Sequence, residues 1–496
     1  MAASEDLTLP VGEDILYSGE AGGRVIRGSA WRAIAGVAGS IAGVGTAALL
    51  LRHLGVSESG RYVTVISLLS IPVVVGDLGL NVSASRWLAL RPAGERRALI
   101  ANVLGQRLLI MPLAIAVVLA FAAAVGYPQR MVLGVVLAGF GFFLAAIANA
   151  LLLRLTVELR NVGLAVVDFM RQGVTLVGVA LLVALGSSLT PFFAVQIASG
   201  LSILAITPLL AGRSALMRPR FDRAEQRLLA MSAFPLAAAL TLGQLYFRLV
   251  IVLMSLISPA RQTGYFGASL RAIEAPVSIS ILIAGVALPL LAAAARDDRA
   301  RMRYAVEGLG KGSVIVGVAV VIVALRGAEP VMAIIGGSAF RPAGAVLRIQ
   351  VGILPFNALY QIWTAALLAL GRQRELILTN ILALAGVAIV AALLVPAFGA
   401  QGGAAASVIG DALLAALIYW RLRAAAGPMM VSASFLGRVA AAAALALAFL
   451  FLLPGIPALV AAVLAGALFL LAGQLFGMVP SEVHEAFRLR RAARRR

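Results

Sequence analysis

The chain has 496 residues, of which 62% are hydrophobic and only 12% are charged, and its mean hydropathy is +1.01. So few polar side chains cannot cover a water-soluble globule of this length, and the composition therefore indicates an integral membrane protein. About fourteen helices of about 20 residues use roughly 280 positions and leave only short connections. This leaves no room for a fused ATPase, a large periplasmic enzyme domain or a soluble nucleic-acid-binding domain.

The formal net charge is +20, and Lys311 is the one lysine among 41 basic residues. Such a charge suits either nucleic acid or the basic loops that orient membrane proteins, and its distribution favours the loops. The chain has no Cys, and its two histidines, His53 and His484, lie far apart in sequence. We therefore expect no disulfide, no metal site and no organic cofactor.

Residues 1–27 hold five acidic side chains and no long apolar run, which is typical of a cytosolic tail and not of a cleaved signal peptide. An N-terminal lobe of six helices is predicted over 28–211. Its apolar runs cover 33–52, 62–80, 99–124, 131–152, 164–186 and 191–211. A basic cytosolic segment, 212–228, links this lobe to the second half.

A second six-helix lobe is predicted over 229–423, followed by a helix hairpin over 424–478 and a basic cytosolic tail over 479–496. The apolar runs cover 229–257, 270–294, 312–326, 343–369, 374–396 and 402–420, and those of the hairpin cover 436–454 and 457–477. The expected fold class is an all-α polytopic membrane protein with about fourteen transmembrane helices.

The basic residues are distributed unequally between the two sides of this topology. With a cytosolic N-terminus, thirty of the 41 fall on inner segments and eight on outer loops or outer helix ends. This asymmetry places both termini in the cytoplasm and accounts for most of the net charge without a nucleic-acid partner. The arginines of the tail can also contact anionic membrane lipids.

An internal repeat is present at an offset of 204 residues. Its members are Gly60, Tyr62, Pro72 and Val73 in the first half and Gly264, Phe266, Pro276 and Val277 in the second. Because each half has an even number of helices, both halves have the same orientation in the membrane. The repeat therefore predicts two lobes related by a pseudo-two-fold axis along the membrane normal.

Polar side chains in four predicted spans fall on one face of each helix. The four stripes are Ser67, Ser70, Asp77 and Asn81; Thr241, Gln244 and Arg248; Arg271, Glu274 and Ser278; and Gln350, Asn357, Gln361 and Thr364. They either satisfy one another between packed helices or line an aqueous cavity between two lobes. Ionisable groups in a span are costly without a partner or water. The cavity accounts for more of the pattern, because the stripes come from corresponding helices of both halves.

Three further ionisable residues lie in predicted spans. Asp168 and Arg171 are spaced for a local ion pair near the membrane interface. Asp411 stands alone in its span, and it fits a proton or cation site as well as it fits a partner of an unidentified arginine. Because they titrate, Asp77, Glu274 and Asp411 are the candidates for ion coupling.

Catalytic patterns are missing from the sequence. Neither histidine lies in a predicted span, so no Ser-His-Asp set can be assembled. Residues 308–313 superficially match a phosphate-binding loop, but Gly follows Lys311 where the motif needs Ser or Thr. We interpret these residues as a loop that enters a helix, and we expect no enzymatic activity.

Four segments carry a family resemblance, in the same order along the chain as in the family. They are 54–62 (LGVSESGRY), 77–80 (DLGL) with Arg86, 368–372 (LALGR) and 398–404 (FGAQGGA). They resemble the bacterial polysaccharide transporters, the O-antigen flippases of the MATE-like (MOP) flippase superfamily. The segments 271–276 (RAIEAP) and 285–289 (GVALP) also resemble the eighth span of lipid II flippases, in which the arginine matching Arg271 is a functional cavity residue.

Ser70 stands where the lipid II flippases carry an arginine, which argues against lipid II as the cargo. The family resemblance implies a V-shaped protein of the bacterial cytoplasmic membrane that moves undecaprenyl-diphosphate-linked oligosaccharides to the outer leaflet by alternating access. It also implies drive by a Na⁺ or H⁺ gradient or by the membrane potential. A two-lobed cavity works as a monomer.

This cargo makes chemical demands that the polar residues meet. A diphosphate requires cationic partners in a water-filled pocket, and the sugar requires amide groups. Candidates for the diphosphate are Arg271, Arg248 and Arg32, and candidates for the sugar are Asn357, Gln361 and Gln244.

Three other functions fit the sequence less well than a flippase. A multidrug or cation antiporter of the same superfamily requires an acidic cavity, whereas the assigned cavity charges are mostly basic. A membrane glycosyltransferase or polymerase usually has acidic residues in a large outer loop, whereas Glu58 and Glu329 stand alone in short ones. A structural scaffold has no need for buried charges.

Overall fold

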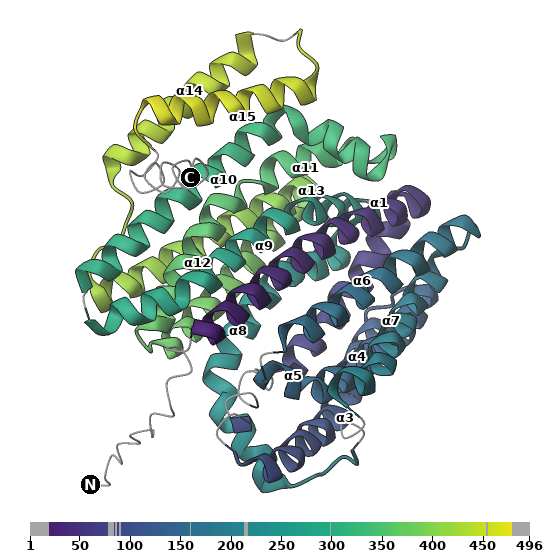
Figure 1. The fold of residues 1–496 in the computed structure, drawn as a ribbon. Coiled ribbons are helices and arrows are strands. Elements are labelled where there is room, and N and C mark those ends of the chain that lie inside the picture. The colour runs from purple at the N-terminus through teal and green to yellow at the C-terminus, as the bar shows by residue number, and fades with distance from the viewer. Residues whose placement is uncertain are drawn as a thin grey trace.

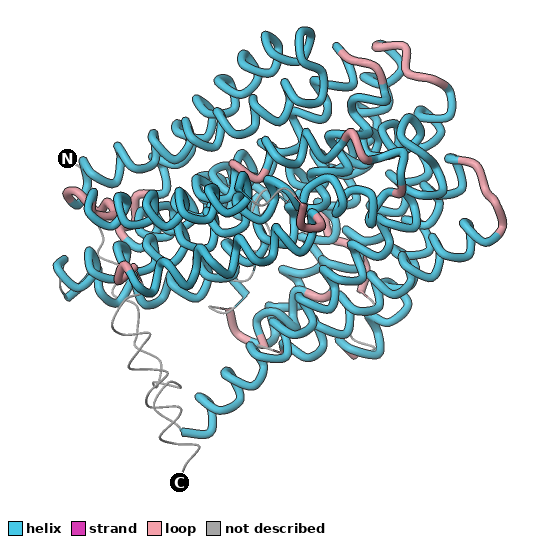
Figure 2. The backbone as a smooth tube through the Cα atoms, turned by 90° about the horizontal axis from the view of Figure 1, so that it is seen from above, coloured by secondary structure: helices cyan, strands magenta, loops and turns pink. Residues whose placement is uncertain are grey.

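The computed structural model describes residues 19–77, 84, 87, 88, 91–158, 160–212, 217–297, 299–452 and 455–478. Almost all of these residues are helical, and none of them forms a strand (Figures 1 and 2). Of the predicted site residues, the side chains of Arg32, Asp77 and Gln244 lie outside this description.

The first half of the chain forms α1 (Gly19–Asp77), α3 (Ala93–Ala124), α4 (Gln129–Leu151), α5 (Leu153–Val157), α6 (Asn161–Ala184) and α7 (Leu189–Ala211). Gly55 divides α1 into two arms, because its φ of 70° lies in the left-handed region that glycine adopts without strain. The helices predicted at 33–52 and 62–80 correspond to these two arms. Within this half, α1 packs on α6, and α4 packs on α7.

The second half forms α8 (Arg223–Ile257), α9 (Ala260–Asp297), α10 (Arg299–Gly336), η3 (Ser338–Phe340), α11 (Ala343–Gln350), α12 (Ile353–Ala369) and α13 (Gln373–Ala426). Gly399, with φ of 54°, divides α13 as Gly55 divides α1. The helix predicted over 343–369 is interrupted at residues 351 and 352, between α11 and α12. Two further helices, α14 (Ala433–Leu452) and α15 (Ala458–Leu475), lie at the edge of the molecule, where α15 packs on α10 (Figure 1).

The interpretation of residues 308–313 as a loop was wrong, because these residues lie inside α10. A Cβ on Gly310 would lie 3.2 Å from a methyl group of Val431. The glycine therefore permits close packing of an intact helix and does not end it.

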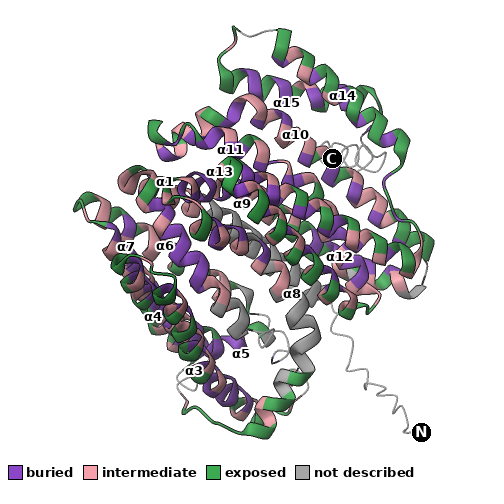
Figure 3. Ribbon diagram, turned by 180° about the vertical axis from the view of Figure 1, so that it is seen from behind, coloured by how far each residue is buried: buried purple, intermediate pink, exposed green. Residues whose placement is uncertain are grey.

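Ten helices among the described residues are long and apolar enough to cross a membrane, and α13, divided by Gly399, counts once among them. Most helices have both a buried and an exposed face (Figure 3). Large apolar side chains stand on the exposed faces, and Leu209, Phe451 and Leu475 are between 82% and 86% exposed. Such faces suit lipid and not water, so the chain is a multi-pass membrane protein. The number of fourteen spans stays a prediction.

The two halves meet at a symmetric crossing of α1 and α9. A Cβ on Gly60 would lie 2.0 Å from the Ala260 carbonyl oxygen, and a Cβ on Gly264 would lie 2.1 Å from the Val56 carbonyl oxygen. Positions 56 and 60 correspond to 260 and 264 at the offset of the internal repeat, so each half presents the same contact to the other. Only glycine lets two helix backbones approach so closely.

The molecule is closed at this crossing and opens further along α9. Residues 62–69 of α1 and 263–270 of α9 are all buried. Beyond position 270 nearly every residue of α9 is partly or fully exposed up to Ile283. The glycine crossing therefore seals one end of the space between the halves, and polar residues of α9 line the part that is open.

The segment that joins the halves is docked on α3. The Arg220 amide donates to the Ala101 carbonyl oxygen at 2.9 Å, and the Asp222 amide donates to Asn102 Oδ1 at 3.0 Å. The Asp222 carboxylate caps α8 by accepting from the Ala224 amide at 2.9 Å. Arg91 and Asn102 also pair with Glu225, so the start of α8 is attached to the first half.

We predict that Gly60→Ala and Gly264→Ala loosen the α1–α9 crossing. The added methyl group meets a backbone oxygen that cannot move aside, so each variant loses about 1–3 kcal/mol of stability and separates the helices. Because the chain has no Cys, a single Ser59→Cys variant reports this separation by maleimide labelling, since Ser59 is fully buried. Gly43→Ala is the matched control, because no atom lies within 4 Å of its Cβ position. Equal labelling in all backgrounds would contradict the prediction.

Candidate functional site

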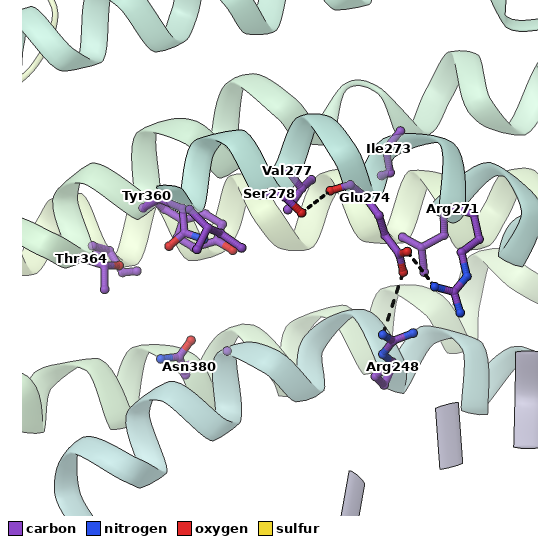
Figure 4. Close-up of a pocket in the computed structure, with 14 residues that line it drawn as sticks. Arg248, Arg271, Ile273, Glu274, Val277, Ser278, Tyr360, Thr364 and Asn380 are labelled. Atoms are coloured by element: carbon purple, nitrogen blue, oxygen red, sulfur yellow. Dashed lines mark hydrogen bonds and ion pairs between the residues drawn. The ribbon is translucent and has the colours of Figure 1, made fainter. Parts of the chain in front are cut away.

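Three charged side chains meet where α8 faces α9. Arg271 Nη1 lies 2.8 Å from Glu274 Oε2, and Arg248 Nη2 lies 3.9 Å from Glu274 Oε1. One carboxylate thus holds two guanidinium groups, one at each oxygen (Figure 4). Among the described residues, no other Asp or Glu pairs with either arginine within 4.0 Å. We call Arg248, Arg271 and Glu274 the charged triad.

The charged triad is cationic and reached by solvent. Its side chains are 28% to 37% exposed, although they stand on helices that are otherwise apolar. Two guanidinium groups carry ten N–H donors, and one carboxylate satisfies only a few of them. The site therefore has positive charge and donors available for a further anion.

A cavity of about 340 Å³ lies beside the charged triad, between α8, α9, α12 and α13. Its polar lining comprises Arg248, Arg271, Glu274, Ser278, Tyr360, Gln361, Thr364 and Asn380. This wall offers both donors and acceptors, because amides and hydroxyl groups serve as both. The arrangement suits a ligand with an anionic group and several hydroxyl groups.

A second cavity, of about 470 Å³, lies on the side of the first half and shares Arg271, Glu274 and Ser278 with the first. Its remaining polar lining comprises Thr46, Tyr62, Asp168, Arg171, Gln172, Thr175, Gln196 and Ser199. The charged triad therefore stands between two polar spaces, one in each half of the molecule. A ligand centred on the triad is able to contact both halves.

Asp168 and Arg171 form the predicted local ion pair, with 3.2 Å between Arg171 Nη2 and Asp168 Oδ1. Both side chains are about half exposed. They stand seven and ten residues beyond the start of α6, roughly 10–15 Å along its axis. Exposed charges at that depth are tolerated where they face a water-filled cavity, and both residues line the second cavity.

Asp411 lies in a fully buried polar cluster of the second half. The side chains of Asn357 and Tyr246 face its carboxylate, and Asn357 Nδ2 donates to Tyr360 Oη at 2.9 Å. Tyr246 Oη donates its proton to the Ser407 carbonyl oxygen at 2.7 Å. In the described part of the chain, the two carboxylate oxygens of Asp411 have no hydrogen-bond partner. The same is true of Asn357 Oδ1. Asn357 and Tyr246 are thus the polar side chains that face this buried acid.

The predicted site residues fall into three groups. Arg248, Arg271, Glu274 and Gln361 line the first cavity. Asn357 and Asp411 are fully buried, and Asn357 donates to Tyr360, which lines the cavity. Arg32, Asp77 and Gln244 stand on α1 and α8 with side chains outside the described part of the chain.

The sequence analysis missed Asn380, Tyr360, Gln172 and Gln196 as cavity residues. Asn380 has no polar residue three or four positions away and forms no stripe. The other three do have such neighbours, which helical periodicity could have identified: Asn357 and Thr364 for Tyr360, Asp168 and Thr175 for Gln172, and Ser199 for Gln196. The stripe of Gln350, Asn357, Gln361 and Thr364 is divided by the break between α11 and α12. Gln350 accepts from the Ser269 hydroxyl group in the protein interior, and only Gln361 and Thr364 face the cavity.

No group of three or more His, Cys, Asp or Glu side chains is placed to hold a metal ion in the described residues.

A family model described as polysaccharide biosynthesis protein matches residues 25–295, which is more than half of the chain. The match includes the charged triad, α1 and the crossing of α1 with α9. No curated protein matches the sequence significantly.

Solved structures with the same fold are transporters. The lipid II flippase MurJ in an inward closed conformation is 13% identical, with a TM-score of 0.74, and the alignment covers 90% of this chain and 98% of that one. An inward-facing multidrug resistance MATE family transporter of the MOP superfamily is 14% identical, with a TM-score of 0.65 and coverage of 77% and 93%. A eukaryotic MATE transporter is 15% identical, with a TM-score of 0.55 and coverage of 82% and 100%. At these identities the likeness concerns the fold.

We predict that Arg271→Ala abolishes function in cells without lowering abundance. Arg271 is the one residue of the triad that is both hydrogen-bonded to Glu274 and shared by the two cavities. Removing a charged donor costs about 1.5–3 kcal/mol, so we expect a loss of about tenfold or more in transport. Arg130→Ala, on the exposed start of α4, is the control. Arg91, which the sequence alone places on a surface loop, is unsuitable because it pairs with Glu225. Full activity of Arg271→Ala would remove this residue from the site.

Proposed function

On the premise that this chain belongs to the polysaccharide biosynthesis protein family, we propose that it is a flippase for lipid-linked oligosaccharides. The cargo is undecaprenyl diphosphate carrying a polysaccharide repeat unit, and the membrane is the bacterial cytoplasmic membrane with both chain termini on the cytoplasmic side. The protein turns the headgroup from the cytoplasmic to the outer leaflet and catalyses no chemical step.

The charged triad between two polar cavities is the observation that carries this proposal. A diphosphate has several anionic oxygens, and guanidinium groups bind such oxygens in pairs. Arg271 and Arg248 come from different helices and converge on one point. Both are suited to hold the diphosphate where the two halves meet, and Arg32 of α1 is a third candidate.

The sugar is assigned to the amide and hydroxyl groups around the triad. Gln361, Thr364 and Asn380 line the first cavity next to Arg248, with Gln244 as a further candidate on α8. Asn357 is better assigned to the Asp411 cluster, because it is fully buried and its amide is used by Tyr360. The polyprenyl tail stays outside the cavities, in the bilayer or along the apolar α14 and α15.

Alternating access requires that the closed end opens while the open end closes. The α1–α9 crossing is the contact that has to separate, and equivalent residues of the internal repeat form it on the two helices. The start of α8 moves with the first half, because Glu225 is bound to Arg91 and Asn102. The rest of α8 packs against α13 in the second half, so α8 links the motions of the two halves.

Asp411 is our preferred coupling site, with Asp77 and Glu274 as further candidates. Asp411 is fully buried, and a buried carboxyl group is stabilised by one positive charge, either its own proton or a Na⁺ ion. The contact from Asn357 to Tyr360 connects Asp411 to the first cavity. Occupancy of the coupling site therefore affects the wall that holds the cargo.

A multidrug or cation antiporter is the second candidate, and the fold shared with MATE transporters favours it. Such a protein binds organic cations through acidic groups, whereas the charged triad has two arginines for one glutamate. The fold of the lipid II flippase supports a lipid-linked cargo, but Ser70 in place of an arginine distinguishes this chain.

The proposed function is tested by depleting the protein in cells and analysing polyprenyl-linked glycans by mass spectrometry. An impermeant sugar-modifying reagent reports which leaflet holds each species. We expect one lipid-linked oligosaccharide to accumulate in a form that the reagent cannot reach. An unchanged lipid pool would refute the flippase and would direct the work to drug and cation export.

We predict that Asp411→Asn uncouples transport from the ion gradient but leaves cargo binding intact. The amide has the shape of the acid and needs neither a proton nor a cation. In proteoliposomes, transport by the variant should no longer respond to an imposed H⁺ or Na⁺ gradient, and separate gradients distinguish the two ions. Glu307→Gln, a variant of an α10 residue paired with Arg303, is the control. A variant that responds like the unmodified protein would exclude Asp411 as the coupling site.

A further inference from the structure

Glu274 occupies the point between two guanidinium groups that an anionic cargo needs. We propose that Glu274 is a built-in competitor of the cargo's diphosphate, which lowers the affinity for the cargo and thereby speeds its release. This inference rests on the proposed function, because it assigns a role to Glu274 within the same site.

The competition follows from the geometry of the charged triad. The carboxylate oxygens of Glu274 are engaged by Arg271 at 2.8 Å and by Arg248 at 3.9 Å. Carboxylates and phosphates bind guanidinium groups in the same way, through oxygens that accept N–H donors. A diphosphate that uses both arginines must therefore replace Glu274 in at least one contact.

The two contacts differ in a way that sets the order of replacement. Arg271 is hydrogen-bonded to Glu274, and it stands one helical turn away on the same helix. Arg248 comes from α8, and its 3.9 Å approach to Glu274 is an ion pair longer than a hydrogen bond. The diphosphate binds Arg248 first. Arg271 then either binds the diphosphate in place of Glu274 or contacts the diphosphate and Glu274 together.

The surroundings of Glu274 allow it to leave its partners and return. A carboxylate released into lipid would cost several kcal/mol, but Glu274 lines two cavities whose walls carry polar side chains. The second cavity also contains Arg171, whose 3.2 Å contact with Asp168 leaves it half exposed. The other titratable groups of these walls are Tyr62 of α1 and Tyr360 of α12. The displaced carboxylate therefore stays among water and cationic groups.

A flippase needs such competition because it must release what it binds. Interactions that hold cargo tightly in both leaflets slow dissociation, and differences in affinity appear mainly in the dissociation rate. When the diphosphate starts to leave, Glu274 regains the arginines and prevents rebinding. Removing its charge should raise affinity and reduce turnover together.

The test is Glu274→Gln in the full chain, reconstituted in lipid nanodiscs. The probe is undecaprenyl diphosphate carrying one N-acetylhexosamine, and the readouts are the dissociation constant, the dissociation rate and the flipping rate in proteoliposomes. We expect about tenfold tighter binding, slower dissociation and slower flipping, since about 1.4 kcal/mol of competition is removed. Glu375→Gln is the matched control, because Glu375 pairs with Arg372 at the same spacing of three residues and lines neither cavity.

The outcomes separate this inference from the proposed function. Unchanged or weaker binding by Glu274→Gln, with normal binding by the unmodified protein, overturns the competitor role alone. Failure of the unmodified protein to bind the probe overturns the proposed function, and so does equal binding by Arg248→Gln and Arg271→Gln variants. Loss of tetraphenylphosphonium binding on Glu274→Gln would identify Glu274 as the acidic group of a cation antiporter and overturn both.

Discussion

The cost of placing charge in a membrane is the constraint on which this site depends. Arg248, Arg271 and Glu274 stand on apolar helices, and they are tolerated there because they pair with one another and face water. The pairing is unequal, with two cations for one anion, so the cavity keeps a positive charge that an anionic headgroup can neutralise. Asp411 is the opposite case, since it is fully buried and its carboxylate oxygens have no hydrogen-bond partner in the described part of the chain.

Symmetry explains how such a cavity is closed at one end. Gly60 and Gly264 each accept the backbone of the other half at the α1–α9 crossing, and both belong to the 204-residue repeat. A contact made twice by equivalent residues is strong when both halves are aligned and is lost on both sides when they tilt. The helices α1 and α9 also line the second cavity. A movement that separates the crossing therefore changes the shape of this cavity.

The sequence predicted the features that depend on local composition. The apolar runs, the all-helical fold and the stripe of Arg271, Glu274 and Ser278 follow from hydropathy and helical periodicity. Prediction from the sequence failed where tertiary packing determines the structure. Gly310 lets α10 pack against Val431 within residues 308–313, and the break after Gln350 separates this residue from Gln361 and Thr364 of the same stripe. Asn380 could not be identified, because no polar residue stands three or four positions from it and it therefore has no periodic signal.

We propose that the charged triad binds a lipid-linked diphosphate while the protein moves it across the membrane. A reconstituted flipping assay measures this movement. Proteoliposomes contain undecaprenyl-diphosphate-linked sugar with a fluorescent label, and an impermeant quencher reports the accessible fraction over time. We expect protein-dependent movement of the label, and we expect the Arg248→Ala, Arg271→Ala double variant to lose this movement while remaining folded. Equal movement in protein-free vesicles, or with the double variant, would contradict it.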